Sequence, residues 1–266
     1  FAKLLYRNFY LSCTLMNPKL KLKLSGFKKE FPSLAKIPIS KSQIFQFYYF
    51  QSCADINVAY KHKAVRYIHT MLVNRNSMLD VSLLPRSFYD SSSQAEKYSK
   101  KNLTALFKSL QAMGIISGIC LNPNSPERSN FKDFFKTFAS IISYCTSLKV
   151  VHVPNCEITD GLDVLAKSAA KAKDFQVSYW DISGNQFEDF SPFATIISHS
   201  KGPITYLNLN NCNIQSKDSK KLFNALTNFS YLDHLQYLSI ASISLSTEQS
   251  FSAFTNFLKV SELKYL

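Results

Sequence analysis

The fold of this chain is decided by the stretch from Ile204 to Ile214, which reads ITYLNLNNCNI. Within it, Leu207 and Leu209 alternate with tyrosine and asparagine, which is the period-two pattern of a strand that has one buried and one open face. The isoleucines at both ends, together with Cys212, extend the apolar set through a tight bend. Because one short strand cannot bury its apolar face alone, the pattern predicts that similar strands lie beside it.

The same pattern recurs along most of the sequence. We number it from Ile204, so that apolar residues occupy positions one, four, six and eleven, and cysteine or asparagine occupies position nine. Clear copies begin at Ile116, Leu148, Val177, Ile204 and Leu235, and a further copy starts at Leu263. A looser copy begins at Met78, with Val81 at position four and Leu83 at position six, and weak copies begin at Leu20 and Ile44. Position nine holds Asn124, Cys156, Asn185 and Cys212 in four consecutive copies.

The segments between these strands carry apolar residues at helical spacing. The stripes span residues 103–110, 131–142, 162–169, 222–229 and 251–258. Each stripe is one helix face wide. A strand, a bend and a helix that repeat about every 30 residues are the signature of a leucine-rich repeat. The sequence therefore predicts an α/β leucine-rich repeat solenoid, a horseshoe in which a concave parallel β-sheet is backed by convex α-helices.

The repeats predict a single domain over residues 1–266, with clear repeats in 78–266 and degenerate repeats in 1–77. The chain starts at Phe1 and stops inside the copy that begins at Leu263. A solenoid needs polar caps at its ends to stay soluble, and the sequence shows neither. We therefore expect a domain that is truncated at both ends.

The net charge of +13 is unevenly distributed. Residues 1–101 hold 17 Lys and Arg against 5 Asp and Glu, whereas residues 102–266 hold 14 against 13. The densest basic patch consists of Lys19, Lys21, Lys23, Lys28 and Lys29. A basic half favours acidic partners such as anionic lipid. The alternative is an ordinary solvated surface, and nucleic acid is disfavoured because no nucleic-acid-binding motif accompanies the charge.

The cysteines and the hydropathy pattern bear on the compartment. No apolar run approaches the length of a membrane span. Cys156 and Cys212 occupy the inward position nine two repeats apart, about 10 Å at the spacing of neighbouring strands, which is too far for a disulfide. Buried thiols of this kind favour a reducing, cytoplasmic location.

Outward positions of the strands supply the candidate binding residues. Position three holds Tyr179, Tyr206, Tyr237 and Tyr265 in the last four copies, after Val150. Tyrosine combines rigid contact area with a polar tip and favours protein interfaces. The alternative is that tyrosine is a good strand residue that stacks on its neighbours. We expect the tyrosines, with His152, Asp181 and Asn208, to form a partner-binding concave face.

Position five reads Ser82, Cys120, His152, Asp181, Asn208 and Ser239 along the predicted sheet. Cys120, His152 and Asp181 follow the order of a nucleophilic thiol, a base and an orienting acid. We reject this enzyme hypothesis because an open strand face excludes no water and offers no oxyanion donors. The sequence also lacks a phosphate loop, and its histidines are scattered. The prediction is a protein that is not an enzyme and uses no cofactor or metal.

The units at residues 148–158, 177–187 and 204–214 resemble leucine-rich repeats of the ribonuclease-inhibitor class, which have a full helix and asparagine or cysteine at position nine. The copy at 177–187, followed by a Phe-rich helix, is similar to the CARMIL family of actin-capping-protein regulators. The capping-protein-binding element of that family lies outside its repeats, so no binding residue carries over. Ran GTPase-activating proteins are an enzyme relative of the same class, and no catalytic residue can be matched to them here.

The expected function is therefore a protein-interaction scaffold that binds a partner on its concave face, in cytoskeletal or signalling regulation. The alternatives are a small-GTPase regulator of the Ran GTPase-activating type, and anionic-membrane docking through the basic half of the chain. The identity of the protein partner and the oligomeric state stay open at this point.

Overall fold

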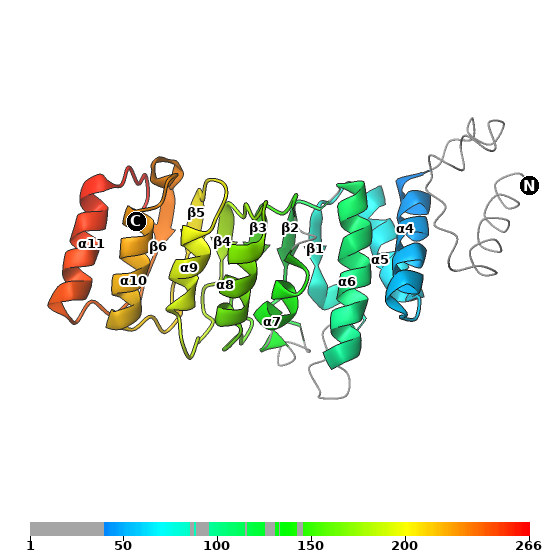
Figure 1. The fold of residues 1–266 in the computed structure, drawn as a ribbon, viewed down its shortest axis with the longest axis horizontal. Helices are drawn as coiled ribbons and strands as arrows, with labels where there is room; N and C mark the ends of the chain where they lie inside the picture. The colour runs from blue at the N-terminus through cyan, green and yellow to red at the C-terminus, as the bar shows by residue number, and fades with distance from the viewer. Residues whose placement is uncertain are drawn as a thin grey trace, which may run out of the picture.

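A computed structural model describes residues 40–85, 88, 96–114, 116–125, 131–132, 134–142 and 146–266. From residue 78 onward, strands and helices alternate along the chain (Figure 1). The strands form one sheet in which every neighbouring pair is parallel and the order follows the chain. They are β1 (Met78–Asp80), β2 (Gly118–Cys120), β3 (Val150–His152), β4 (Tyr179–Asp181), β5 (Tyr206–Asn208) and β6 (Tyr237–Ser239).

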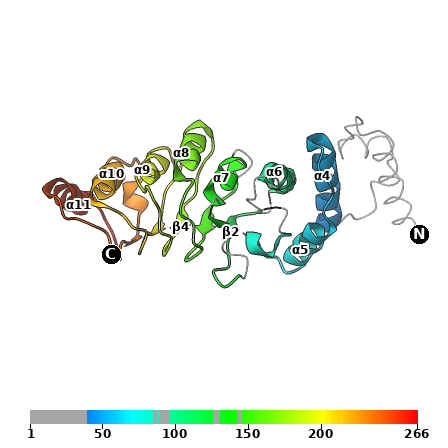
Figure 2. The same cartoon turned by 90° about the horizontal axis from the view of Figure 1, so that it is seen from below.

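Helices line one side of this sheet. They are α6 (Glu96–Met113), α7 (Phe134–Ala139), α8 (Leu162–Lys171), α9 (Pro192–Ser198), α10 (Ser216–Thr227) and α11 (Glu248–Val260). Two further helices, α4 (Lys41–Ile56) and α5 (His62–Val73), precede β1. Seen from below, helices α7 to α11 form a layer on one side of the strands (Figure 2). The predicted leucine-rich repeat solenoid is confirmed, and we call the open side of its sheet the concave face.

The register predicted from the template is confirmed in β2 to β6. Position four is inward and fully buried in each of them, at Ile119, Val151, Trp180, Leu207 and Leu238. Trp180 joins the two layers, because its ring packs edge-on against Phe193 of α9 with centroids 5.5 Å apart. Burying one such residue per repeat between sheet and helix gives the solenoid a continuous core.

The predicted register of the first strand is wrong by two residues. Leu79, and not Val81, pairs with Ile119 and is completely buried, so the copy begins at residue 76. Val81–Leu83 form a 3₁₀ turn, and Leu83 is 59% exposed. Position five of this repeat is consequently Asp80 and not Ser82, because Asp80 pairs with Cys120.

The weak copy at Ile44 is also wrong, because these residues lie inside helix α4. Ser40 caps that helix by accepting a hydrogen bond from the Gln43 amide, and the Gln43 side chain accepts one from the Ser40 amide. Such a capping box fixes a helix start. The weak copy at Leu20 lies outside the described residues.

Position nine connects consecutive repeats through buried side chains. The Asn185 carboxamide is completely buried, and its Oδ1 accepts hydrogen bonds from the Cys156 and Ile158 amides at 3.0 and 3.1 Å. Its Nδ2 donates to the carbonyls of Val153 and Ile182 at 2.8 and 2.7 Å. Every polar atom of Asn185 is therefore used, as buried amides require.

The other position-nine residues make weaker links. Cys212 directs its thiol at the Ile182 carbonyl, with the sulfur 3.2 Å from the oxygen. Cys156 and Cys212 are buried thiols and form no disulfide. Asn124 does not follow the prediction, because its side chain is exposed.

The bends after β3 to β6 depend on a left-handed backbone at position eight. This position holds Asn155, Gly184, Asn211 and Ser242 in four consecutive repeats, with φ between 52° and 70°. Glycine and asparagine tolerate this region best among the amino acids. A Cβ atom at Gly184 would also collide with the side chain of Asn155 one repeat earlier. The turn residues thus fix both the bend and the stacking of the repeats.

All five predicted stripes contain a helix, although α7 covers only Phe134–Ala139 of the stripe at 131–142 and α10 ends at Thr227 in the stripe at 222–229. The stripe at 251–258 is wholly helical, but not all of its apolar residues are buried. In α11, Phe254 and Phe257 pack against Phe223 of α10, with ring centroids 4.9 and 5.5 Å apart. Phe251 and Leu258 of the same predicted stripe are instead exposed, Phe251 by 58%. Within the described residues α11 packs on one neighbouring helix, α10, so its apolar surface is covered on that side alone.

Candidate functional site

The tyrosines predicted from position three lie side by side on the concave face. Tyr179 pairs with Tyr206, and Tyr206 pairs with Tyr237. Tyr265 continues the row through an isolated parallel bridge to Tyr237. The first three side chains are half-buried, whereas Tyr265 is 65% exposed. We call these four side chains the tyrosine row.

The rings of the row stack on one another. The centroids of Tyr179 and Tyr206 are 4.1 Å apart with planes 7° from parallel, and those of Tyr206 and Tyr237 are 4.2 Å apart at 4°. Tyr265 departs from the stack, with its centroid 6.4 Å from that of Tyr237 and its plane tilted by 44°. At the other end, the His152 ring lies 6.3 Å from Tyr179 and is tilted by 52°.

This geometry determines which part of each ring a partner can reach. The rings stack from one strand to the next across the sheet, so each ring face is turned toward the ring on the neighbouring strand. The ring edges and the phenol hydroxyls therefore form the outer ridge of the row. Burial, followed by the neighbouring Tyr179 phenol, raises the pKa of Tyr206, and burial raises the pKa of Tyr179. Both phenols thus keep their protons at neutral pH.

The polar column at position five runs parallel to the tyrosine row. His152 Nδ1 lies 3.5 Å from Asp181 Oδ2, with the histidine side chain 42% and the aspartate side chain 10% exposed. Asp181 Oδ1 accepts hydrogen bonds from the Ser183 hydroxyl at 2.7 Å and from the Ser183 amide at 3.2 Å. Asn208 Nδ2 reaches the same Ser183 hydroxyl at 3.4 Å. The predicted residues His152, Asp181 and Asn208 are thus brought together in one network.

The Asp181 carboxyl is held ionised by this network. Burial raises its pKa, but the hydrogen bonds from His152 and Ser183 lower it by more, so that the pKa lies below its usual range. A carboxylate with these partners has little capacity left for a ligand. Asp181 therefore works as an internal anchor that orients His152.

Cys120 has no features of an activated nucleophile. Burial, and secondarily the carboxylate of Asp80, raise the pKa of its thiol to about 12. A reactive cysteine instead has a lowered pKa beside a cationic group. His152 turns Nδ1 toward Asp181 on the next strand, on the opposite side from Cys120.

Cationic side chains flank the tyrosine row at the starts of the strands. Lys149 precedes β3, and its Nζ donates to Gln176 Oε1 at 2.6 Å. Lys264 precedes Tyr265, and its Nζ donates to Gln236 Oε1 at 3.3 Å. The row thus lies between two ammonium groups that are held by neutral side chains.

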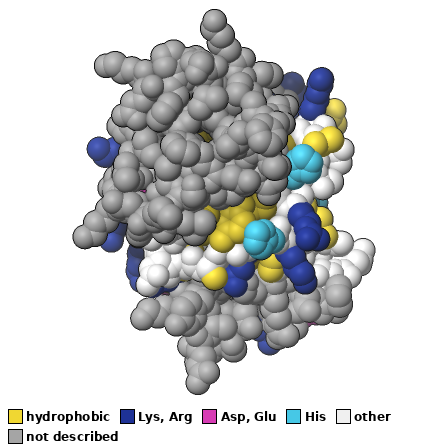
Figure 3. All heavy atoms as spheres, turned by 90° about the vertical axis from the view of Figure 1, so that its right-hand side faces the viewer, with side chains coloured by type: hydrophobic (Ala, Val, Ile, Leu, Met, Phe, Trp, Pro, Cys, Tyr) yellow, Lys and Arg dark blue, Asp and Glu magenta, His cyan; other side chains and the backbone are white. Residues whose placement is uncertain are grey.

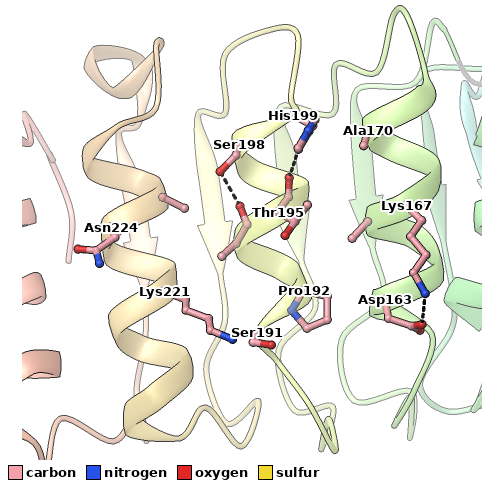
Figure 4. A pocket seen from close by; sticks show the side chains of 13 residues that line it. Asp163, Lys167, Ala170, Ser191, Pro192, Thr195, Ser198, His199, Lys221 and Asn224 are labelled. Carbon is pink, nitrogen blue, oxygen red and sulfur yellow. Dashed lines mark hydrogen bonds and ion pairs between the residues drawn. The ribbon is translucent and has the colours of Figure 1, made fainter.

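A second hollow lies on the helical side of the solenoid. A groove of about 770 Å³ lies over α9, because α9 is shorter than its neighbours α8 and α10 (Figure 4). Small side chains of α8 and α9 form its floor, and Lys221 points from α10 toward Ser191. On the α8 side, Lys167 is paired with Asp163 at 3.2 Å.

The predicted basic patch of Lys19, Lys21, Lys23, Lys28 and Lys29 lies outside the described residues. Seen from the N-terminal end of the solenoid, Lys, Arg and His side chains border a hydrophobic area over α4 and α5 (Figure 3). His69 of α5 is engaged with the Ser42 hydroxyl of α4, with Nδ1 to Oγ at 2.8 Å. In the described residues, no three His, Cys, Asp or Glu side chains are close enough to hold a metal ion.

The main residue that sequence reasoning missed is Asp80, which follows from the register error in β1. Asp80 caps the 3₁₀ turn over Val81–Leu83 by accepting a hydrogen bond from the Ser82 amide at 2.9 Å. Its own amide donates to the Tyr67 hydroxyl at 2.8 Å. Tyr67 comes from α5, so α5 is linked by this bond to the first strand of the sheet.

No helix in the described part of the chain is long and apolar enough to cross a bilayer.

Comparison with known proteins assigns no family to this chain. No protein-family model matches the chain, and no curated protein matches it.

Proposed function

We propose that this chain is a binding scaffold that holds a protein partner against its concave face. The observation that carries the proposal is the tyrosine row, an aromatic ridge that runs across consecutive strands at outward positions. Tyrosine at an exposed, pre-ordered position contributes contact area at little cost in side-chain entropy. Stacking already fixes the rings of Tyr179, Tyr206 and Tyr237, so little order remains to be imposed on binding.

The same surface supports a role without catalysis. The position-five column contains one thiol, and its pKa of about 12 leaves Cys120 protonated at neutral pH. The carboxylate of Asp181 is occupied by His152 and Ser183. We therefore propose that the concave face binds its partner and does not transform it.

The family proposal rests on the repeat pattern. Residues 148–214 resemble the ribonuclease-inhibitor class of leucine-rich repeats, whose scaffolds serve protein recognition. The further similarity to CARMIL proteins favours a cytoskeletal or signalling role. The buried thiols of Cys156 and Cys212 favour a reducing compartment such as the cytoplasm.

The test removes the ridge and leaves the scaffold. Wild-type chain and the Tyr206→Ala/Tyr237→Ala variant are immobilised, and proteins captured from an extract of the source cells are quantified by mass spectrometry. A partner held by the tyrosine row should be captured at least about tenfold less by the variant, as expected for interface anchors. Tyr231→Ala is the matched control, because Tyr231 is an exposed tyrosine outside the row.

Circular dichroism and thermal unfolding show that each variant is folded before capture is compared. A partner lost with the double variant and retained with Tyr231→Ala supports concave-face binding. If every captured protein is retained by the double variant, the concave-face proposal is wrong.

A further inference from the structure

The stacked rings restrict the chemistry of the partner, given the proposed role of the concave face. Tyr206 has a stacked ring on both of its faces, and Tyr179 and Tyr237 each have one on the face turned toward Tyr206. At the two ends of the stack, His152 and Tyr265 lie at tilts of 52° and 44°. Nucleobases, indoles and guanidinium groups bind tyrosine by lying on a ring face. Such groups cannot reach the faces inside the stack, so the ridge does not select for them.

The ridge instead presents ring edges and phenol hydroxyls. Ring edges carry the positive part of the aromatic quadrupole. The hydroxyls of Tyr179 and Tyr206 keep their protons, because burial raises their pKa values. The Tyr206 hydroxyl is hydrogen-bonded to those of Tyr179 and Tyr237, and three hydroxyls in a chain use two protons between them, which leaves one donor for a ligand. Both features attract hydrogen-bond acceptors, and anionic acceptors most strongly, because hydrogen bonds to a charged group are the stronger ones.

The groups around the ridge point to the same partner chemistry. Lys149 lies at the β3 end of the row and Lys264 at the Tyr265 end, each held by a glutamine side chain. The nearest acid at position five, Asp181, has a side chain that is only 10% exposed and is hydrogen-bonded by Ser183 and in contact with His152. Lys149 and Lys264 thus place a positive charge at each end of the ridge.

We propose that the tyrosine row binds an extended peptide segment that carries Asp or Glu side chains. Carboxylates at the ends of the segment pair with Lys149 and Lys264, and a central acceptor meets the phenol hydroxyls of Tyr206 and Tyr237. The strands from β3 to the Tyr265 bridge span about 19 Å at a spacing of about 4.8 Å, which an extended segment of about six residues covers. Nucleic acid shares the negative charge, but inside the stack its bases would find no open ring face.

The experiment pans a random-peptide phage library on the immobilised wild-type chain and sequences the enriched clones. Enriched peptides should carry Asp or Glu about five residues apart. Their synthetic versions should bind the Tyr206→Phe variant about tenfold more weakly, because the stack is kept while one hydrogen bond to a carboxylate is lost. Tyr231→Phe should leave the affinity unchanged.

Lysine substitutions provide the second arm. Lys149→Gln and Lys264→Gln should each weaken acidic peptides and reduce the salt dependence of binding, because an ion pair is removed. These changes lie on the surface, and Gln can still bond the glutamine neighbour, so the fold is expected to persist.

The outcomes separate this inference from the proposed function. Peptides that depend on the tyrosine row but are neutral or basic overturn the acidic-segment inference and leave the concave-face function standing. Enriched peptides that all bind Tyr206→Ala/Tyr237→Ala normally overturn both. A single-stranded oligo-dT that binds through the row more tightly than any enriched peptide overturns the assignment to a peptide.

Discussion

Asn185 and Cys212 occupy the same template position in consecutive repeats, and their removal should have very different costs. Asn185→Ala leaves the buried amides of Cys156 and Ile158 without their acceptor, which both of them reach at about 3 Å. It also removes the donor to the carbonyls of Val153 and Ile182. Cys212→Ala removes a thiol whose sulfur lies 3.2 Å from the Ile182 carbonyl oxygen and 3.6 Å from the Asn210 carbonyl oxygen.

The magnitudes follow from what each substitution leaves behind. An orphaned buried N–H group costs about 1–3 kcal/mol, so the two amides at Asn185 alone give about 2–6 kcal/mol. A thiol is a weak donor, and the Ile182 carbonyl keeps the Asn185 amide as its partner. Removing the Cys212 sulfur should therefore cost about 1 kcal/mol of apolar burial. The difference between the two variants should exceed about 1 kcal/mol.

The free energies are measured by urea unfolding followed by circular dichroism at fixed pH. Hydrogen exchange supplies a local readout, because the amides of Cys156 and Ile158 should lose protection in Asn185→Ala and keep it in Cys212→Ala. If Asn185→Ala costs no more than Cys212→Ala, or if the two amides stay protected, the account of position nine as a hydrogen-bonded link is refuted.

Three further predictions concern stability. Leu207→Ala should cost about 2–5 kcal/mol in urea unfolding, because it opens a cavity in the completely buried strand layer; Tyr231→Ala, at an exposed position, is its control. Ser242→Asn should raise the unfolding free energy by about 0.5–1 kcal/mol, because φ is 65° and asparagine tolerates the left-handed region better than serine. The new Asn Nδ2 can replace the Ser242 hydroxyl as the donor to Asn211 Oδ1, and a lower midpoint would contradict the prediction. The folded-state pKa of Asp181 is lowered, so its stabilising contribution is present above the pKa of the unfolded carboxyl and is lost as pH falls through the folded pKa. Asp181→Asn should therefore flatten the acid limb of a stability–pH profile, and an unchanged limb would exclude this source.

The sequence predicts the register of a strand well where only one set of residues can form its apolar face. In β4 and β5 the inward residues stand between polar or amphipathic ones, so a shift of register would expose them. At β1 the choice is ambiguous, because Met78, Leu79, Val81, Leu83 and Leu84 are all apolar. The 3₁₀ turn over Val81–Leu83 breaks the alternation, buries Leu84 and turns Leu83 outward, and nothing in the spacing distinguishes these two.

The sequence marks the start of helix α4, although apolar residues in the same segment also fit the repeat template. Ile44, Phe47 and Tyr49 satisfy the first three apolar positions of the repeat, although they also suit a helix. The capping box of Ser40 and Gln43 is the local feature that separates the two interpretations. Position eight is a similar case, because Asn155, Gly184 and Asn211 recur at a fixed place and mark the left-handed bend.

The concave face illustrates where sequence reasoning stops. The alignment of Tyr179, Tyr206 and Tyr237 follows from the register and could be predicted. Their parallel stacking could not, because it depends on the rotamer that each ring shares with its neighbour. The same holds for the contact between His152 and Asp181, which depends on side-chain orientation and on Ser183 two residues further along.

The distribution of residues at position three argues against tyrosine as a mere strand former. If strand propensity or cross-strand stacking explained the row, similar residues would be expected at this position in every repeat. The first three strands instead place Met78, Gly118 and Val150 there. Gly118 is closely packed, because a Cβ atom would collide with Met78 and Val150, so a bulky ring has no room in that part of the sheet. One half of the concave face thus carries small or aliphatic residues at position three and the other half carries an aromatic ridge on the same scaffold, which is the arrangement that the proposed binding role of the ridge predicts.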